Sequence, residues 1–206
     1  MVKKKFTAII QARLGSTRFR KKILKKINKK TLIEFLYERI SSLKNIEQTL
    51  IATTTSKVDD ELCKLLSKKK INFYRGSENN VLKRFYEASK KIKSEYIIRI
   101  CGDCPLIDLE VVNQIILRAN LKNLDYISNT IEPTFPDGLE VEIFKTKLLK
   151  KAFINATKKH DKEHVTPFII RNVSKKENFK YKKDLSKYRL TIDEPIDYRV
   201  ISKTYS

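Results

Sequence analysis

Short apolar runs alternate along this chain with stretches whose apolar residues recur every three or four positions. A short apolar run is typical of a buried strand, and the three- and four-residue spacing is typical of an amphipathic helix. The predicted strands are 6–10, 49–53, 71–74, 96–101 and 125–128, and the predicted helices are 31–43, 57–68, 109–121 and 146–156, with a further helix opening within 75–85. This alternation predicts an α/β fold with a mostly parallel sheet and crossover helices.

Further patterns predict a turn, a hairpin and two helix starts. In 134–144 a Pro-Asp-Gly turn leads into alternating residues, which places Glu140 and Glu142 on the face opposite three apolar side chains. The segments 179–183 and 188–192 are expected to form a β-hairpin. Pro195 suits the first turn of a closing helix, and Ser56 is a candidate N-cap for the helix 57–68.

Length and composition limit the classes of protein. The chain has 206 residues, which suits one domain, 1–206, with a substantial core. It contains no run of about 18 apolar residues, so no membrane span is expected. The N-terminal segment 1–10 leads directly into the next loop without a small-residue cleavage site, which favours a strand over a signal peptide. Three cysteines without a disulfide framework indicate a reducing cytoplasm.

The formal net charge of +21 invites a nucleic-acid interpretation. The basic residues are mostly lysines spread over every segment, without a compact arginine stripe interleaved with aromatic residues. Solvated surface is therefore the preferred interpretation, and no specific nucleic-acid partner is expected. The charge should still attract anionic substrates.

The most informative stretch is 8–24, in which an apolar run ends at Gln11 and a basic loop follows. Gly15 permits a tight turn or a close approach to a ligand, and Ser16 and Thr17 offer hydroxyl groups. The arginines of the loop offer planar donors that match phosphate oxygens. A strand that leads into such a loop can hold a polyphosphate, and a solvated basic turn is the alternative.

Asp103 follows the predicted strand 96–101, and Asp193 ends the segment 188–192. In parallel sheets, ligands bind at the carboxyl ends of strands, and a carboxylate there can hold Mg²⁺ together with substrate phosphates. A turn residue is the alternative for Asp103, and a helix N-cap is the alternative for Asp193. Cys101 and Cys104 form a CxxC pair, but without a second pair or a histidine partner it does not indicate a zinc or redox site.

Separate segments, in the same order along the chain, resemble the sugar cytidylyltransferases. The closest likeness is to enzymes like the spore coat polysaccharide biosynthesis protein F, and 3-deoxy-manno-octulosonate and acylneuraminate cytidylyltransferases are more distant. The matching segments are IIQARLGSTR (9–18), RGSENNVLKRF (75–85), RICGDCPLID (99–108), FPDGLEVEIF (135–144), EHVTPFI (163–169) and RLTIDEPID (189–197). Arg20 and Lys21 stand where that family usually has Pro-Gly, and Asn79 and Asn80 replace two acids.

The resemblance implies a three-layer α/β/α sandwich like that of nucleotide-diphospho-sugar transferases. It implies transfer of CMP from CTP to a small-molecule sugar, with Mg²⁺ as cofactor, release of pyrophosphate and a homodimeric assembly. It assigns nucleotide binding to Gln11, Ala12, Arg13, Gly15, Ser16, Thr17, Arg18, Lys22, Arg75, Arg99 and Asp103. It assigns catalysis to Arg13, Lys22 and Asp103, metal binding to Asp103 and Asp193, and sugar binding to Asp137, Glu140, Glu142 and His164.

Alternatives stay open at this point. The chain could be a related nucleotidyltransferase that uses another nucleotide or a non-sugar acceptor. It could also be a basic binding protein without catalytic activity. His164 could act as an acid or base, but a lone histidine near a helix start is more often structural. The residues do not name the acceptor sugar.

Overall fold

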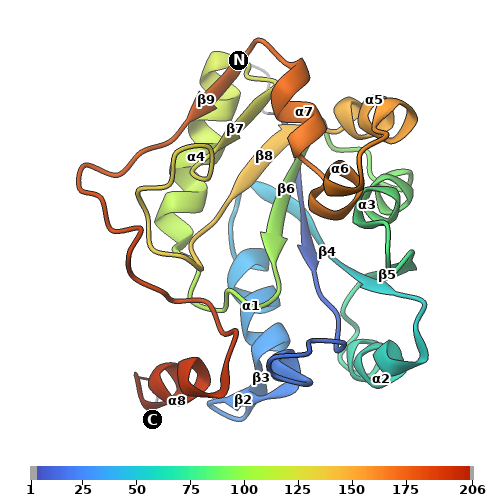
Figure 1. Ribbon diagram of the computed structural model, residues 1–206, viewed down its shortest axis with the longest axis vertical. Helices are drawn as coiled ribbons and strands as arrows, with labels where there is room; N and C mark the ends of the chain where they lie inside the picture. The colour runs from blue at the N-terminus through green and yellow to red at the C-terminus, as the bar shows by residue number, and fades with distance from the viewer. Residues whose placement is uncertain (1–3, 205–206) are drawn as a thin grey trace.

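The computed structural model describes residues 4–204. Within them a seven-stranded sheet has the order β5-β4-β1-β6-β8-β7-β9, and β8 runs antiparallel to both of its neighbours while the other neighbouring strands are parallel (Figure 1). The strands are β1 (Phe6–Gln11), β4 (Ile46–Thr54), β5 (Phe73–Gly76), β6 (Tyr96–Cys101), β7 (Tyr126–Ser128), β8 (Glu142–Lys145) and β9 (Lys176–Asn178). The mostly parallel α/β fold is confirmed.

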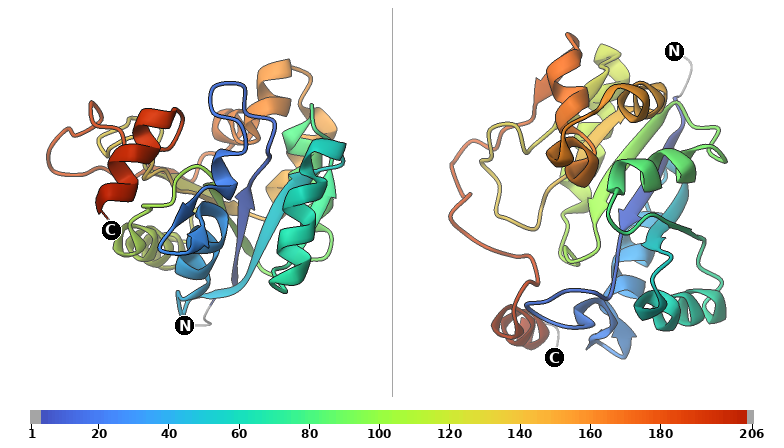
Figure 2. Two further views of the ribbon diagram at one scale, coloured as in Figure 1. Left: turned by 90° about the horizontal axis from the view of Figure 1, so that it is seen from below. Right: turned by 45° about the vertical axis from the view of Figure 1, so that its right-hand side comes forward.

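Helices cover both faces of this sheet (Figure 2). They are α1 (Leu32–Ser41), α2 (Asp60–Lys68), α3 (Val81–Ser89), α4 (Leu109–Lys122), α5 (Lys147–Asn155), α6 (Lys159–His164), α7 (Pro167–Asn172) and α8 (Pro195–Thr204). One core cluster joins α1, α2 and α4 to one face, and a second joins α3, α5 and α7 to the other. Alternate residues of β1 divide between them, because Ile10 belongs to the first cluster and Ile9 to the second. The three-layer prediction is therefore confirmed.

Local capping explains where several helices begin. Thr31 and Glu34 form a reciprocal capping box at the start of α1, Asn80 accepts from the Lys83 amide at α3, and Asp108 caps α4. The prediction for Ser56 is wrong. Ser56 precedes the short 3₁₀ helix η2 (Lys57–Asp59) and its side chain makes no capping hydrogen bond, while α2 begins only at Asp60.

The predicted hairpin over 179–192 is also wrong. Only β9 is a strand in this part of the chain, it lies before the predicted segments, and it pairs in parallel with β7. The backbone amides of the later residues donate hydrogen bonds instead to two loops, one after β6 and one before β8. The amides of Leu190 and Thr191 both donate to the Asp137 carbonyl, and the Ile192 amide donates to the Asp103 carbonyl at 2.8 Å. The tail is therefore extended but spans two loops, which brings Asp193 to the same edge as Asp103.

The closing helix α8 begins at Pro195, as predicted. Ile201 packs it against Ile27 and Leu32, near a small hairpin of β2 (Lys26–Ile27) and β3 (Lys30–Thr31) that follows the 3₁₀ helix η1 (Lys22–Leu24). No helix between residues 4 and 204 is both long enough and apolar enough to cross a membrane. The predicted strand in 1–10 is present from Phe6, and residues 1–3 lie outside the described residues.

Candidate functional site

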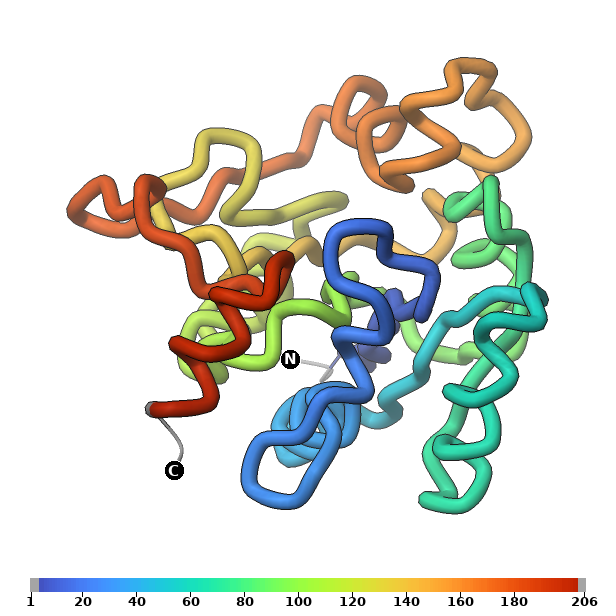
Figure 3. The backbone as a smooth tube through the Cα atoms, turned by 60° about the horizontal axis from the view of Figure 1, so that its bottom comes forward, coloured from blue at the N-terminus to red at the C-terminus, as the bar shows by residue number. Residues whose placement is uncertain are grey.

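A cleft opens where β1 and β6 end side by side. The two strands pair in parallel with Gln11 opposite Cys101, so the segments that follow them emerge together. The loop 11–22, called the opening loop here (blue in Figure 3), lies in the centre of this edge, between the C-terminal segment and α2. The residues lining the cleft are Gln11, Ala12, Arg13, Gly15, Ser16, Thr17, Arg18, Lys22, Ile23, Cys101, Gly102, Asp103 and Asp193. Nine of the eleven predicted nucleotide-binding residues are among them, and the other two are Arg75 and Arg99.

The opening loop is held from below by one buried carboxylate. Asp59 is 2% exposed, and it accepts from the Leu14 amide at 2.6 Å and from the Thr54 amide and hydroxyl. The loop closes on itself where the Lys21 amide meets the Leu14 carbonyl at 3.4 Å, and Ser16 accepts from the Phe19 amide. Asp59 thus fixes the loop to the end of β4, a role for which the sequence offers no signal.

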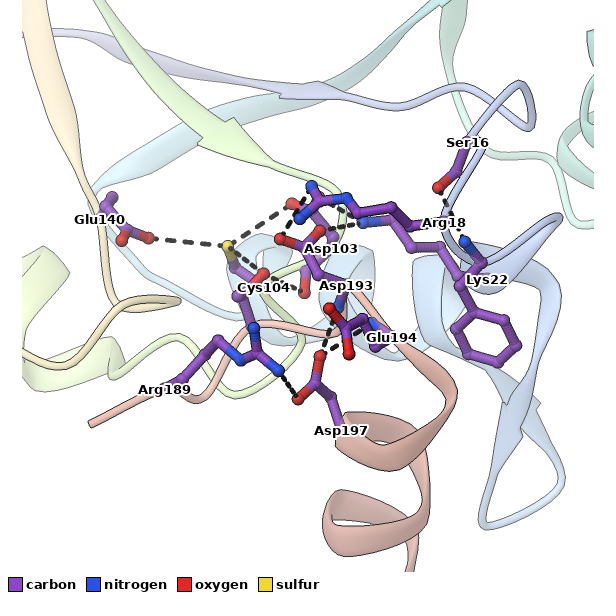
Figure 4. A network of polar contacts seen from close by, with 12 residues as sticks. Ser16, Arg18, Lys22, Asp103, Cys104, Glu140, Arg189, Asp193, Glu194 and Asp197 are labelled. Atoms are coloured by element: carbon purple, nitrogen blue, oxygen red, sulfur yellow. Dashed lines mark hydrogen bonds and ion pairs between the residues drawn. The ribbon is translucent and has the colours of Figure 1, made fainter. Parts of the chain in front are cut away.

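Two aspartates meet at the centre of the site, around one lysine. Lys22 Nζ lies 2.7 Å from Asp103 Oδ2 and 2.7 Å from Asp193 Oδ1, and Arg18 Nη2 lies 3.0 Å from Asp193 Oδ2 (Figure 4). Lys22 is only 7% exposed. Burial alone would lower the pKa of Lys22, but the two carboxylates outweigh it and raise that pKa above its usual value.

Backbone contacts fix both aspartates in place. A Cβ on Gly102 would lie 2.8 Å from the Gln11 carbonyl, so only glycine allows this approach to β1 directly before Asp103. Asp197 accepts from the amides of Asp193 and Glu194 at 2.9 and 2.8 Å. Since Asp197 caps this turn and the Asp193 side chain faces Lys22 and Arg18, Asp193 is not the N-cap of α8.

The site was predicted to hold Mg²⁺. Within residues 4–204 no three metal-ligating side chains come together. Asp103 and Asp193 nevertheless share one cation, the Lys22 ammonium, so their oxygens converge on a common point. Mg²⁺ in nucleotide enzymes commonly uses one or two carboxylates and takes its other ligands from phosphates and water. The donor set therefore fits this ion.

Arg99 and Glu142 form a buried ion pair beneath the cleft. Glu142 also accepts from the Tyr126 hydroxyl at 2.8 Å and the Thr166 hydroxyl at 2.5 Å. Arg99 in turn donates to Gln11 Oε1 at 3.3 Å. Burial would lower the pKa of Arg99, but Glu142 raises it. Glu142 was expected on a solvated or sugar-facing strand surface, whereas it is 5% exposed and already meets three donors. Arg99 reaches the cleft only through Gln11.

Glu140 lies on the other side of the centre. Both of its oxygens accept from the Gly138 amide, and one lies 3.7 Å from Cys104 Sγ, which is itself 3.7 Å from Asp103 Oδ1 (Figure 4). Burial and a hydrogen bond with Asp137 raise the pKa of Glu140 to about 7. Gly138 has φ of +104°, and a Cβ there would lie 2.4 Å from the Thr191 nitrogen. This glycine lets the 136–140 turn contact the tail that carries Asp193.

Two of the predicted binding residues, Arg75 and His164, lie outside the cleft. Arg75 donates to the carbonyls of Thr54 and Ser56 and pairs with Asp60 at 2.7 Å, so it ties the end of β4 to α2. His164 is exposed at the end of α6, with its ring 4.5 Å from that of His160. His164 ends α6 and lies three residues before the start of α7, so it is near a helix start. Neither Arg75 nor His164 lines the cleft.

Known proteins resemble this chain over most of its length. An uncharacterized protein of Methanocaldococcus jannaschii is 39% identical over 168 residues, covering 82% of this chain and 68% of that protein. The spore coat polysaccharide biosynthesis protein SpsF of Bacillus subtilis is 32% identical over 210 residues, covering 96% of this chain and 85% of that protein.

A solved structure also resembles this chain. The structure of a cytidylyltransferase from Leptospira borgpetersenii superposes with a TM-score of 0.87 at 32% identity, covering 96% of this chain and 84% of that one. The sequence model of the cytidylyltransferase family matches residues 7–204. The chain therefore belongs to the cytidylyltransferase family and is a nucleotidyltransferase.

Proposed function

We propose that this chain transfers CMP from CTP to a hydroxyl group of an acidic sugar and releases pyrophosphate. The observation that carries the proposal is the meeting of Lys22, Asp103 and Asp193 at 2.7 Å distances, directly below a loop that holds Arg13 and Arg18. Cations on the loop suit a triphosphate, and the paired carboxylates suit the metal that accompanies it. The likeness to cytidylyltransferases of acidic sugars supports the choice of acceptor.

In the proposed reaction the sugar hydroxyl, the anomeric one, attacks the α-phosphorus of CTP. A new P–O bond forms, the bond from the α-phosphorus to the bridging oxygen breaks, and the oxygen stays with pyrophosphate. Arg13, Arg18 and Lys22 hold the phosphates and meet the negative charge that develops on the leaving group. Mg²⁺ held by Asp103 and Asp193 would supply further charge neutralisation there.

The hydroxyl proton needs an acceptor near the centre. Glu140 is the candidate, because its pKa of about 7 lets it exchange a proton at neutral pH. It is linked to the centre through Cys104, whose Sγ contacts both Glu140 and Asp103. Asp137 shares the hydrogen bond that raises the pKa of Glu140 and would help to orient the acceptor.

Pyrophosphate release tests the proposal directly. The purified chain is incubated with Mg²⁺, each of the four nucleoside triphosphates and a panel of bacterial acidic sugars. Release with CTP and one acidic sugar is expected. Release with a different triphosphate, or only with a non-sugar acceptor, would favour a related nucleotidyltransferase, and no release with any pair would favour a binding protein.

Assembly and surroundings belong to the same proposal. We expect a homodimer, as the resemblance implies, and sedimentation at micromolar concentration measures its mass.

We also expect a cytoplasmic protein without a specific nucleic-acid partner. If the surface lysines are merely solvated, binding to random duplex DNA is weak and disappears with modest salt. Tight, salt-resistant binding to one sequence would contradict this.

A further inference from the structure

Arg84, in the first turns of α3, is the largest side chain that is almost completely enclosed, with 1% of its surface exposed. Its Nη1 donates to the Ser77 carbonyl at 2.8 Å, and its buried Nε has no hydrogen-bond partner among the described residues. No carboxylate within residues 4–204 forms an ion pair with it. A buried charge without a paired carboxylate destabilises a fold. The presence of this buried guanidinium therefore calls for a functional explanation.

The charged groups around Arg84 belong to the opening loop and its supports. Burial and the positive charges of Arg13 and Arg99 together lower the pKa of Arg84 to about 10, although Asp59 and Glu78 oppose them. These carboxylates already have other partners. Asp59 accepts from Leu14 and Thr54, and Glu78 lies 3.9 Å from Arg13. Among the described residues, neither carboxylate therefore forms an ion pair with Arg84.

The packing places Arg84 directly under a contact between two loops. A Cβ on Gly76 would lie 3.0 Å from Arg84 Cγ, so the backbone of the 76–80 loop rests on the arginine stem. On the other side, a Cβ on Gly15 would lie 3.8 Å from Glu78 Oε1, so the 76–80 loop touches the opening loop. A single hydrogen bond to the Ser77 carbonyl needs only a neutral donor, and it does not explain the charge.

We propose that Arg84 is a positioning residue whose buried charge favours binding of the triphosphate, acting through the loop above it. This rests on the proposed function, since it assumes a polyphosphate in the cleft. Arg84 does not touch the nucleotide, because it is enclosed. Its field crosses protein instead of water, so added salt screens it little. The charge is retained for anion affinity, although it lowers stability.

Binding of CTP, CDP and CMP by isothermal titration calorimetry tests this, in the wild-type chain and in Arg84→Met and Arg84→Lys. The methionine variant keeps a long unbranched side chain and removes the charge. It should weaken CTP binding about tenfold, CDP binding less and CMP binding least, as expected for a charge acting at a distance. The lysine variant keeps the charge and should bind CTP within about threefold of wild type.

Stability separates this role from a structural one. Replacing a buried unpaired charge with an apolar side chain is neutral or stabilising, so Arg84→Met should unfold in urea at the same or a higher midpoint than wild type. Arg118→Met is the matched control. Arg118 lies on α4, outside the cleft, and its loss changes the net charge equally. That control should leave CTP binding unchanged.

Three outcomes would overturn the proposal. The first is wild-type CTP affinity in Arg84→Met. The second is an equal loss for CTP, CDP and CMP, which would indicate a structural distortion. The third is a lower urea midpoint or failure to fold in Arg84→Met. Arg84→Gln is a second neutral variant, and it should show the same loss of CTP affinity as Arg84→Met. A wild-type chain that binds no CTP would overturn the proposed function itself, and the role of Arg84 with it.

Discussion

The nucleotide side and the acceptor side of the cleft are built differently. The nucleotide side takes most of its groups from one continuous loop, 11–22, whose end reaches Asp103 and Asp193 through Lys22. The acceptor side depends on single residues of a turn, and Glu140 gains its unusual pKa only from its surroundings. The conformation of one continuous loop positions many side chains on the nucleotide side together. On the acceptor side, each side chain is positioned by its own packing contacts.

The largest expected effect is on the centre of the nucleotide side. Asp103→Asn and Asp193→Asn should each lower kcat at least about 10²-fold, because the electrostatic stabilisation of the transition state is lost. Turnover with limiting Mg²⁺ measures this, and circular dichroism checks the fold. Each variant leaves Lys22 the other carboxylate as an ion-pair partner, so the fold should survive. Near wild-type turnover in either variant would remove the metal assignment.

Arg13 tests the loop with its charge preserved. Arg13→Lys should lower kcat/KM for CTP about tenfold, because an ammonium cannot reproduce the planar, two-pronged contact of a guanidinium with phosphate oxygens. Arg13 is about half exposed in the cleft, and its one ion pair within residues 4–204 is a 3.9 Å contact with Glu78, so its replacement should not alter stability. Steady-state kinetics with varied CTP measures the effect. A fully active lysine variant would mean that only the charge of Arg13 matters.

Replacing Glu140 and Glu142 in turn compares two glutamates that are two positions apart in the chain but differ in burial. Glu142→Gln leaves buried Arg99 without its counter-ion and should cost about 3 kcal/mol of unfolding free energy. Glu140→Gln should instead remove an activity rise centred near pH 7, because the deprotonated carboxylate is the proposed proton acceptor. Urea unfolding and pH–rate profiles of both variants separate the two roles. A pH profile unchanged by Glu140→Gln would exclude it as the base.

The stability of the wild-type chain should also depend on Glu140. Its folded pKa is raised from 4.5 to about 7, so the native state binds more protons than the unfolded state between these values. Stability therefore falls as the pH rises from about 4.5 to 7, by about 2 kcal/mol after allowance for partial exposure. Glu140→Gln should lack this fall. Urea midpoints at pH 5 and pH 8 measure it, and equal slopes in both proteins would contradict it.

The same contrast explains what the sequence could predict. Gln11 to Arg18 lie in one segment, so a short motif places them together, and nine of the predicted nucleotide residues do line the cleft. Glu142 was misjudged because alternation says which residues share a face but not what packs on that face. Here Tyr126 and Thr166 fill it. Asp59 and Arg84 were missed because their roles arise from burial by distant segments.

The tail shows a further limit of local patterns. The segment 188–192 has strand-like composition and was predicted to pair within a hairpin. Its amides bond instead to the carbonyls of Asp137 and Asp103, which lie more than fifty residues earlier in the chain. Local sequence does not specify such long-range partners. The correct placement of Asp193 followed from the family resemblance and not from the predicted hairpin.

The smallest expected effect concerns the departure of the opening loop from its relatives, Arg20-Lys21 in place of Pro-Gly. Lys21 has φ of +54°, a left-handed conformation that glycine adopts more easily than lysine. Lys21→Gly should therefore relieve strain of about 1 kcal/mol, offset in part by loss of the exposed ion pair with Glu61. The net gain in unfolding free energy should be at most about 0.5 kcal/mol.

Activity should not change in Lys21→Gly, because the conformation that positions Lys22 already matches the one glycine prefers. Glu61→Gln serves as the control, since it removes the same ion pair without altering the backbone. Subtracting its effect on the urea midpoint leaves the backbone contribution alone. A glycine variant that folds but loses CTP turnover would show that the lysine side chain itself shapes the loop. The role of Lys22, which was assigned by likeness to relatives with glycine at this position, would then have to be withdrawn.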